Sequence, residues 1–273
     1  MLVPLPIVLP LLGAGVTILV GRSRRAQRIV SVAVLSALVA NAVALVILVD
    51  RDGPIVARAG GWIPPMGITL VADRLSTITL TAASIALLLV VINAIGHPGT
   101  ERHHVGFQSV YLVMTAGVGG ALLAGDLFNL FVAIEMMLTA SYVLITLGGR
   151  VDQVRSSMTY VVISLVASSF FLVGISFIYA STATVNLAEL AGRLEQIDPG
   201  MRLALAVVFL IVFGIKAGLF PLCFWLPDSY PNAPSPVAAI FAALLTKIGV
   251  YAINRTQTLL FSEVVPTWML MSV

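Results

Sequence analysis

The stretch GIKAGLFPLCFWLPDSYPNAPSPVAAIFAALLTKIGVYAINR at 214–255 decides the fold of this chain. It carries one lysine near each end, Lys216 and Lys247, and a run of prolines between them. A proline has no backbone N–H to donate, and its ring clashes with the preceding helical turn. The stretch therefore predicts a helix that breaks near the middle of a membrane, just after Lys216. The residues expected in the break are Gly218, Pro221, Pro227 and Pro231, with Pro234 and Pro236 following.

The composition places this stretch in a membrane protein. Hydrophobic residues make up 59% of the 273 residues and charged residues only 10%, against roughly 45–50% and about 25% in soluble domains. The net charge of +3 comes from arginines in short connections, where positive charge sets topology. We therefore expect no nucleic-acid partner. The single cysteine, Cys223, excludes an internal disulfide and a multi-cysteine metal or iron–sulfur site.

Apolar runs long enough to cross a bilayer recur along the whole chain. A span needs about 20 mostly apolar residues. The sequence predicts spans at 2–20, 29–49, 75–95, 106–124, 127–148, 158–180, 203–222 and 236–254, and the start of another at 257–273. The last run ends without a polar flank, so we expect the chain to be truncated within a ninth span.

The order of charges at the N-terminus indicates its topology. A basic cluster at 22–28 follows the first apolar run, whereas a cleavable signal peptide has its basic residues before the apolar run. The positive-inside rule places this cluster in the cytoplasm. We expect a retained first span and an external N-terminus in a multi-pass protein of a bacterial inner membrane.

Three connections are long enough to interpret. The segment 50–74 is rich in glycine and proline and predicts an ordered external loop with a turn or hairpin at Trp62 to Met66. In 181–200, leucines spaced three and four apart predict a short amphipathic helix at the external surface. The segment 96–104 holds all three histidines. Only one acid accompanies them, so we expect a solvated loop and no metal site.

Glu135 is a solitary acid inside an apolar span. An ionisable group near the middle of a bilayer costs at least about 2.5–3.5 kcal/mol, and it persists mainly where it lines an ion path or pairs with another charge. One interpretation is a protonated carboxyl that only hydrogen-bonds a neighbouring helix. The alternative is a titratable group held by a basic partner. Asp126 is positioned to cap the helix that carries Glu135.

The chain has only two lysines, Lys216 and Lys247, and both lie in apolar segments. Broken membrane helices often line cavities where ions or protons are handled, and a desolvated lysine releases its proton more easily. Lys216 could instead extend its ammonium to the membrane surface. Arg255, eight residues after Lys247, is near the end of its span. We therefore expect Lys247 to be buried, in a proton path or in a structural ion pair.

Small hydroxyl residues give one span a candidate polar face. They are Ser164, Ser168, Ser169 and Ser176. Such residues can hold water, although in membrane helices they also permit close packing.

Two segments carry a resemblance to a known family: GDLFNLFVAIEMMLTASYVLI at 125–145 and the stretch at 214–255. Both resemble the antiporter-like subunits shared by Mrp multisubunit cation/proton antiporters and respiratory complex I. GGWIPPMGITLVADRLS at 60–76 and TKIGVYAINRTQTLLF at 246–261 resemble the D-type subunits of Mrp Na⁺/H⁺ antiporters. The likeness extends over essentially the whole chain.

The resemblance implies an all-α polytopic membrane fold with inverted repeats and a broken seventh helix. Residues 1–105 would hold the first three spans, 106–254 the first repeat, and 255–273 the start of the second. Glu135, Lys216 and Lys247 would carry protons. The resemblance implies no cofactor, and its partners are other integral membrane subunits, protons, and Na⁺ or another monovalent cation.

Three functions remain open from the sequence. The first is a secondary transporter subunit, which is not an enzyme. The second is a proton-pumping subunit of NADH:quinone oxidoreductase or of a membrane-bound hydrogenase, which needs the same residues. The third is a structural scaffold, in which neutralising the buried charges leaves transport intact.

Overall fold

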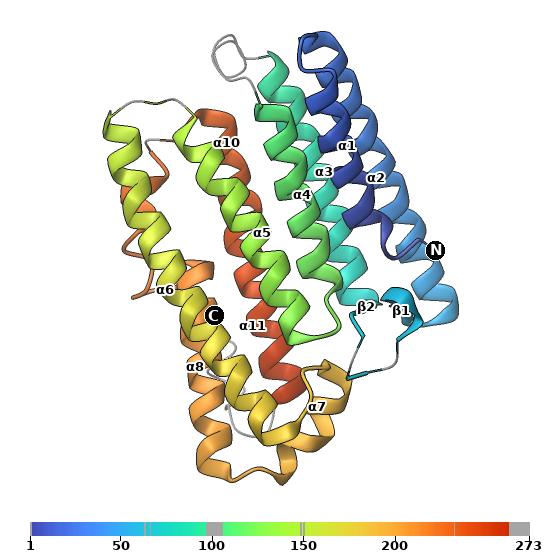
Figure 1. Ribbon diagram of the computed structural model, residues 1–273, viewed down its shortest axis with the longest axis vertical. Helices are drawn as coiled ribbons and strands as arrows, with labels where there is room; N and C mark the ends of the chain where they lie inside the picture. Colours follow the sequence, from blue (N-terminus) through green and yellow to red (C-terminus); the bar gives the residue numbers. More distant parts are fainter. Residues whose placement is uncertain are drawn as a thin grey trace.

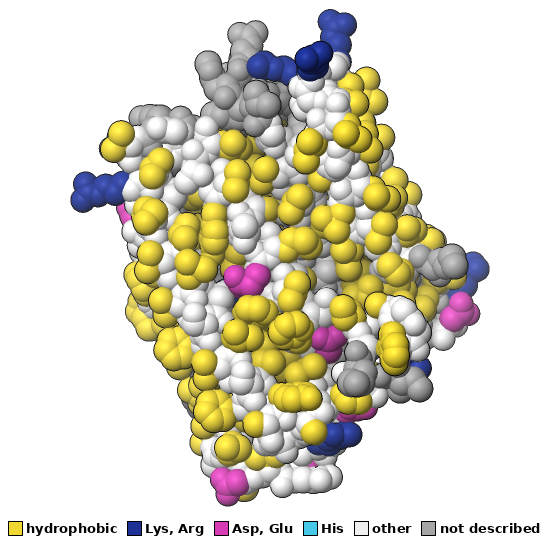
Figure 2. All heavy atoms as spheres, viewed as in Figure 1, with side chains coloured by type: hydrophobic (Ala, Val, Ile, Leu, Met, Phe, Trp, Pro, Cys, Tyr) yellow, Lys and Arg dark blue, Asp and Glu magenta, His cyan; other side chains and the backbone are white. Residues whose placement is uncertain are grey.

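The chain folds into a bundle of long apolar helices, as the composition predicts. The computed structural model describes residues 2–62, 64–65, 67–96, 106–147, 149, 151–231 and 233–261. Within that part, six helical segments are long and apolar enough to cross a membrane, and two shorter apolar helices accompany them. Figure 2 shows hydrophobic side chains across the middle of one face and lysine or arginine side chains at its margins. Acidic side chains also lie within this face, among the hydrophobic ones.

The helices follow one another with short connections. Their bounds are α1 Leu5–Leu19, α2 Arg24–Asp52, α3 Arg74–Gly96, α4 Phe107–Leu123, α5 Leu127–Thr146, α6 Val151–Thr182, α7 Leu187–Arg193, α8 Pro199–Ala217, α9 Leu226–Ser229, α10 Ser235–Ile240 and α11 Thr246–Leu260. The segment Phe241–Leu245 joins α10 to α11 as a π-helix. Each predicted span up to residue 254 therefore overlaps a helix.

Four predicted boundaries are wrong: α2 begins at Arg24 and not at 29, α6 begins at Val151 and not at 158, and two further ends differ. The span at 203–222 ends earlier, because α8 stops at Ala217. The sequence also separates spans at 254 and 257, whereas α11 continues to Leu260. The polar residues in this stretch fall within one helix and do not mark a turn. Residues 262–273 of the expected ninth span, and most of the histidine segment, lie outside the described residues.

The loop at 50–74 contains a small hairpin. Strands β1 (Ile55–Arg58) and β2 (Thr69–Ala72) pair antiparallel, with Ile55 opposite Ala72. The predicted hairpin is thus confirmed, with strands that flank the expected turn. Its backbone also reaches the bundle, because the Gly125 N–H donates to the Thr69 carbonyl at 2.8 Å. In Figure 1 the hairpin and α7 lie at the same end of the bundle.

The predicted amphipathic helix in 181–200 is confirmed as α7. The Asn186 side chain accepts hydrogen bonds from the backbone at the start of α7 and so caps it. Leu187, Leu190 and Leu194 are all buried, as their spacing predicts.

The helix break after Lys216 is also confirmed. Gly218 has a φ of 68°, a left-handed conformation that glycine adopts without a Cβ clash. The Leu219 N–H donates to the Gly214 carbonyl at 3.0 Å and the Gly218 N–H to the Ile215 carbonyl at 3.2 Å. These two bonds form a Schellman motif, which ends α8. All four residues expected in the break lie between the end of α8 and the start of α10.

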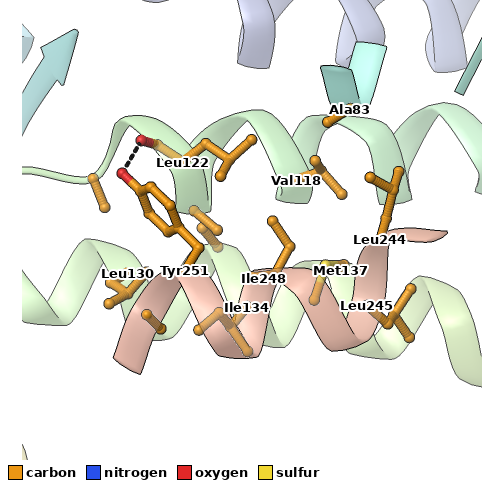
Figure 3. Packing of buried hydrophobic residues seen from close by; sticks show 14 of the residues in the cluster. Ala83, Val118, Leu122, Leu130, Ile134, Met137, Leu244, Leu245, Ile248 and Tyr251 are labelled. Carbon is orange, nitrogen blue, oxygen red and sulfur yellow. Dashed lines mark hydrogen bonds between the residues drawn. The ribbon is translucent and has the colours of Figure 1, made fainter. Parts of the chain in front are cut away.

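Helix α11 packs into the centre of the bundle beside α4 and α5. Figure 3 shows Leu244, Ile248 and Tyr251 of α11 and its preceding turn against side chains of those two helices. The Tyr251 hydroxyl donates to the Leu122 carbonyl at 2.7 Å. Helix α11 also contacts α8, and α8 contacts α6. The core therefore brings the end of α8 next to α5, α6 and α11.

Candidate functional site: an acid, a hydroxyl and a lysine

Glu135 lies near the middle of α5. As predicted, the Asp126 side chain caps the start of this helix by accepting from the Asn129 N–H. Glu135 is nine residues beyond Asp126, about 13 Å along the helix axis. Its side chain is 24% exposed in the isolated chain. The carboxylate is thus held deep in a membrane-length helix and is only partly covered.

Lys216 lies in the last turn of α8, at the break. Its side chain is only 5% exposed. A cation is stabilised at this end of a helix, because the unpaired carbonyls there carry partial negative charge. At this end the Ile215 carbonyl accepts from Trp225 Nε1 at 3.0 Å in addition to the Gly218 N–H. The break therefore fixes both the position of Lys216 and the polar backbone around it.

Ser168 of α6 connects these two charged groups. Lys216 Nζ donates to Ser168 Oγ at 2.9 Å, and Ser168 Oγ donates to the carboxylate of Glu135. The direct separation between Lys216 Nζ and Glu135 Oε1 is 3.7 Å, which is an ion pair but too long for a hydrogen bond. The hydrogen-bonded path between acid and base therefore runs through the serine.

The predicted pairing of Glu135 with Lys216 on facing helices is confirmed. Pairing reduces the cost of two charges in an apolar environment, provided that hydrogen bonds satisfy their remaining atoms. The alternative in which Lys216 reaches the membrane surface is wrong, because its ammonium contacts Ser168 and Glu135 within the bundle.

The prediction that Lys247 is buried is wrong for the part of the chain that the structure describes. Its side chain lies at the surface, where Nζ donates to the Ala242 carbonyl at 2.7 Å and to Thr246 Oγ1 at 3.3 Å. Apolar neighbours in sequence do not fix which side of a helix a residue faces. The exposed stripe on α11 that includes Lys247 also contains Val250, Asn254 and Thr258.

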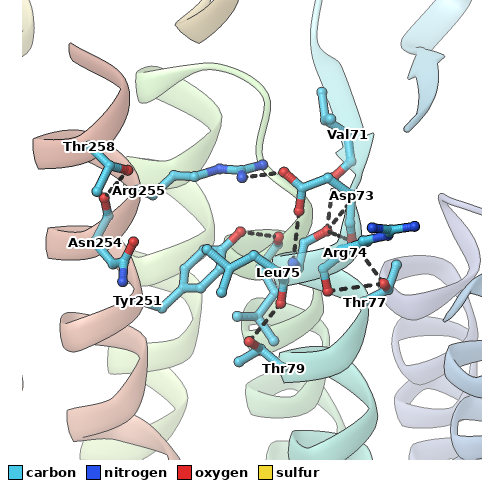
Figure 4. Close-up of polar contacts among 12 residues, drawn as sticks. Val71, Asp73, Arg74, Leu75, Thr77, Thr79, Tyr251, Asn254, Arg255 and Thr258 are labelled. Carbon is cyan, nitrogen blue, oxygen red and sulfur yellow. Dashed lines mark hydrogen bonds and ion pairs between the residues drawn. The ribbon is translucent and has the colours of Figure 1, made fainter. Parts of the chain in front are cut away.

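A second ion pair, which no sequence pattern indicates, joins Asp73, the residue before α3, to Arg255 of α11. Arg255 is 8% exposed and its guanidinium donates to the carboxylate of Asp73, as Figure 4 shows. The Arg255 guanidinium also lies 5.9 Å from the centre of the Tyr251 ring, within cation–π range. Arg255 thus links α11 to the residue that precedes α3.

This pair predicts acid sensitivity. Burial raises the pKa of Asp73, but hydrogen bonds from the Ser76 N–H and from Arg255 outweigh it and hold that pKa below its usual value. A carboxyl whose pKa is lower in the folded state than in the unfolded state stabilises the fold at any pH above the unfolded pKa. This stabilisation is lost as the pH falls through the folded pKa.

We expect Asp73→Asn to lower the free energy of unfolding in detergent at pH 7 by about 1–3 kcal/mol. The difference from wild type should shrink below about pH 4. The exposed Asp50, which pairs with Arg74 at 3.0 Å, supplies a control. Asp50→Asn should change stability by less than about 1 kcal/mol, and an equal loss in both variants would contradict the assignment.

The four serines proposed as a polar face divide into two kinds. Ser164 and Ser168 are buried and face the bundle. Ser169 and Ser176 are exposed and donate to carbonyls of their own helix, Leu165 and Leu172. Ser164 and Ser168 are one helical turn apart and so share a face of α6, but this spacing does not indicate that their face is the buried one.

Among the described residues, no three acidic, histidine or cysteine side chains come together in a way that could hold a metal ion. The site described above is made of the Glu135 carboxylate, the Ser168 hydroxyl and the Lys216 ammonium. The fold and the site together define a class of protein: polytopic helical membrane proteins that hold a buried acid–base pair near the middle of the bundle, beside a broken helix.

The comparison with protein families agrees with this class. Residues 124–273 match the family model described as NADH:quinone oxidoreductase/Mrp antiporter, transmembrane. The matched region contains Glu135, Ser168 and Lys216. The chain belongs to this family.

Curated relatives are antiporter subunits. The chain is 45% identical over 265 residues to the D subunit of the Na(+)/H(+) antiporter of Alkalihalophilus pseudofirmus, a match that covers 96% of this chain and 53% of the relative. It is 41% identical over 258 residues to the corresponding D subunit of Bacillus subtilis, covering 94% and 52%. The chain thus spans about half the length of these relatives.

Two solved structures share the fold. A chain of the Mrp complex from Dietzia sp. DQ12-45-1b superposes with a TM-score of 0.88 at 36% identity, covering 95% of this chain and 49% of that one. A chain of the membrane-bound sulfane sulfur reductase, an archaeal respiratory membrane complex, gives a TM-score of 0.89 at 28% identity, covering 98% and 55%.

Proposed function

We propose that this chain is the proton-translocating part of one component of a multisubunit Na⁺(cation)/H⁺ antiporter of the bacterial plasma membrane, with its N-terminus outside. The observation that carries the proposal is the hydrogen-bonded series Lys216, Ser168, Glu135 at the end of a broken helix. The two curated antiporter relatives support the choice of cation and of partner membrane subunits. The protein makes no covalent bond in this role, so it is a transporter component and not an enzyme.

The series can transfer a proton in one concerted step. The Lys216 ammonium gives a proton to Ser168 Oγ while Ser168 gives its own proton to the Glu135 carboxylate. The products are a neutral amine, an unchanged hydroxyl and a neutral carboxylic acid. Because the step converts an ion pair into two neutral groups, any change in nearby charge shifts its equilibrium. A cation that approaches the site is such a change.

Lys247 is proposed as the next proton carrier. Gly249, two residues later on α11, lies so close to α8 that a Cβ built on it would meet the Ala217 backbone nitrogen at 2.5 Å. Lys247 is therefore on the helix that adjoins the Lys216 end of α8. A lysine and two polar residues on one exposed stripe of a membrane helix are costly against lipid. This cost supports a protein or water environment for that stripe in the full-length protein.

A subunit of a respiratory complex is the second candidate, and the likeness to the archaeal sulfane sulfur reductase chain supports it. The higher identity to the two curated antiporter subunits favours the antiporter. Purification of the intact assembly tests the choice. Small cation-antiporter subunits should co-purify, and redox subunits in their place would overturn the antiporter assignment.

Ser168→Ala tests the relay itself. In full-length protein we expect Na⁺-dependent proton exchange, measured by fluorescence of ΔpH in inverted vesicles, to fall by about tenfold to a hundredfold, because the hydroxyl that joins acid and base is removed. Ser169→Ala is the matched control, since Ser169 is adjacent and donates to the Leu165 carbonyl of its own helix. Wild-type exchange by an assembled Ser168→Ala complex would exclude the serine from the path.

A further inference from the structure

A cavity lies between the hairpin, α7 and α11, away from the Lys216 site. Its volume is about 560 Å³, within the range of roughly 300–1,000 Å³ that is usual for pockets that hold small molecules. One part of its wall is apolar and includes Val56, Val71, Leu187 and Leu259. The other part is made of charged and polar side chains. The cavity therefore offers both an apolar surface and a polar end to a ligand.

Arg255 gives this cavity a buried donor without a partner. The residue is 8% exposed and lines the cavity. One of its terminal nitrogens donates to Asp73, but its Nε–H makes no hydrogen bond to any residue that the structure describes. Buried donors are seldom left unpaired. An acceptor in the cavity can take this hydrogen bond.

Glu189 of α7 supplies the opposite kind of group. Its Oε2 is buried and makes no hydrogen bond within the described part of the chain. The ion pair of Oε2 with Arg193 is 3.8 Å long, which is too long for a hydrogen bond. An ionised carboxylate can only accept, so Oε2 needs a donor. The cavity thus presents a donor that lacks an acceptor and an acceptor that lacks a donor.

The charged side chains that line the cavity balance one another. They are two arginines and two acids, Arg58, Arg255, Asp73 and Glu189. Asp73 is already occupied, because it accepts from Arg255 and from the Ser76 N–H at 2.8 Å. Arg58 is exposed on β1, and guanidinium groups bind phosphate well. This leaves Arg58 and the Nε of Arg255 for a negative group, and Glu189 for a positive one.

The cavity also lies at the depth of lipid headgroups. Asp73 directly precedes the membrane-length helix α3, and Arg255 is in the last two turns of α11. Figure 1 places the hairpin and α7 at the end of the bundle opposite the connection between α1 and α2. The polar part of the cavity is therefore at a membrane surface, where the headgroup of a phospholipid meets its acyl chains.

We propose that this cavity binds a phospholipid with a primary ammonium headgroup, of the phosphatidylethanolamine class. The phosphate accepts hydrogen bonds from Arg255 Nε and from Arg58, the ammonium donates to Glu189, and an acyl chain covers the apolar wall. A headgroup with one negative and one positive charge matches a wall without net charge. A choline headgroup has no N–H to donate, and a glycerol headgroup carries no cation. The site is independent of the proposed proton relay.

Photocrosslinking of the full-length protein in its complex tests the site. The probe is a phosphatidylethanolamine with a diazirine in one acyl chain. We expect crosslinked peptides from β1, α7 or the end of α11. Unlabelled phosphatidylethanolamine should compete at a concentration at least about tenfold lower than phosphatidylcholine or phosphatidylglycerol, because each of these loses a hydrogen bond between charged groups. Inorganic phosphate should not compete at those concentrations, because it has no acyl chain.

Variants of the cavity give the second part of the test. Arg58→Gln and Glu189→Gln should each reduce crosslinking by about tenfold. Glu189→Gln should also abolish the preference over phosphatidylcholine, because the partner of the ammonium is then neutral. Arg255→Lys keeps a cation beside Asp73 but removes Nε, and it should reduce crosslinking as well.

Arg74→Gln and Glu195→Gln are the matched controls. They make the same changes at exposed positions that do not line the cavity, and they should crosslink like wild type. Native gels check that each complex assembles. Because Arg58 is exposed, Arg58→Gln keeps the test decisive even if Arg255→Lys fails to assemble.

Four results would overturn the proposal. They are crosslinks confined to other peptides, equal competition by phosphatidylethanolamine and phosphatidylcholine, wild-type crosslinking by Arg58→Gln and Glu189→Gln, and competition by inorganic phosphate at the concentrations of the lipid. The last result would identify a site for a free anion.

Discussion

Lys216→Ala in the full-length protein is expected to reduce Na⁺-dependent proton exchange by at least about a hundredfold, the scale on which a positioned proton donor contributes to a reaction. Without the ammonium, Glu135 has no partner with which to exchange a proton, and its protonation state becomes fixed. Glu135→Ala should have the same effect for the reciprocal reason. Lys216→Arg should also fail or be severely impaired, because a guanidinium remains charged and cannot release its proton.

Loss of stability is the competing explanation for such a result. Removing one member of a buried ion pair can cost about 3–5 kcal/mol, so each variant complex must be shown to assemble on a native gel beside the measurement of ΔpH. Normal exchange by a fully assembled Lys216→Ala complex would make this lysine structural. The scaffold function left open by the sequence would then be correct.

Gly249→Ala is expected to damage the same site from a distance. A Cβ at residue 249 would lie 2.5 Å from the backbone nitrogen and 2.7 Å from the Cα of Ala217. These are backbone atoms that cannot rotate away, so α11 and α8 must separate next to Lys216. Overpacking of this kind costs about 1–3 kcal/mol or more. We expect a lower unfolding temperature in detergent and reduced exchange.

Gly15→Ala is the matched control for that substitution. It also lies within an apolar helix, α1, and a Cβ there meets nothing within 4 Å. Alanine favours a helix over glycine by about 0.5–1 kcal/mol, so this variant should be as stable as wild type or slightly more stable. If Gly249→Ala behaves like Gly15→Ala, the close approach of α8 and α11 is not needed for the site.

The sequence predicts the helices and the break well, because their signals are local. Twenty-residue apolar runs identify spans, and the closely spaced prolines after Lys216, together with Gly218, predict that the helix ends there. The cost of an isolated charge in a membrane also predicts that Glu135 and Lys216 pair, since each is the partner that the other needs.

Features that depend on three-dimensional packing were not predictable in the same way. Ser168 and Ser169 are chemically identical neighbours in sequence, and only the rotation of α6 sends one toward Lys216 and the other to the surface. The same rotational ambiguity explains the wrong prediction for Lys247. Asp73 and Arg255 are 182 residues apart and each lies at the margin of a span, where charges are common and carry no signal of pairing.

Infrared difference spectroscopy tests most directly whether Glu135 exchanges a proton through Ser168. Full-length wild-type protein would be cycled between two pH values while the C=O stretch of protonated carboxylic acids is recorded. The relay predicts a band that is absent in Glu135→Gln, altered in Ser168→Ala and unchanged in Ser169→Ala. A wild-type spectrum identical to that of Glu135→Gln would mean that Glu135 keeps one protonation state, and would contradict the account.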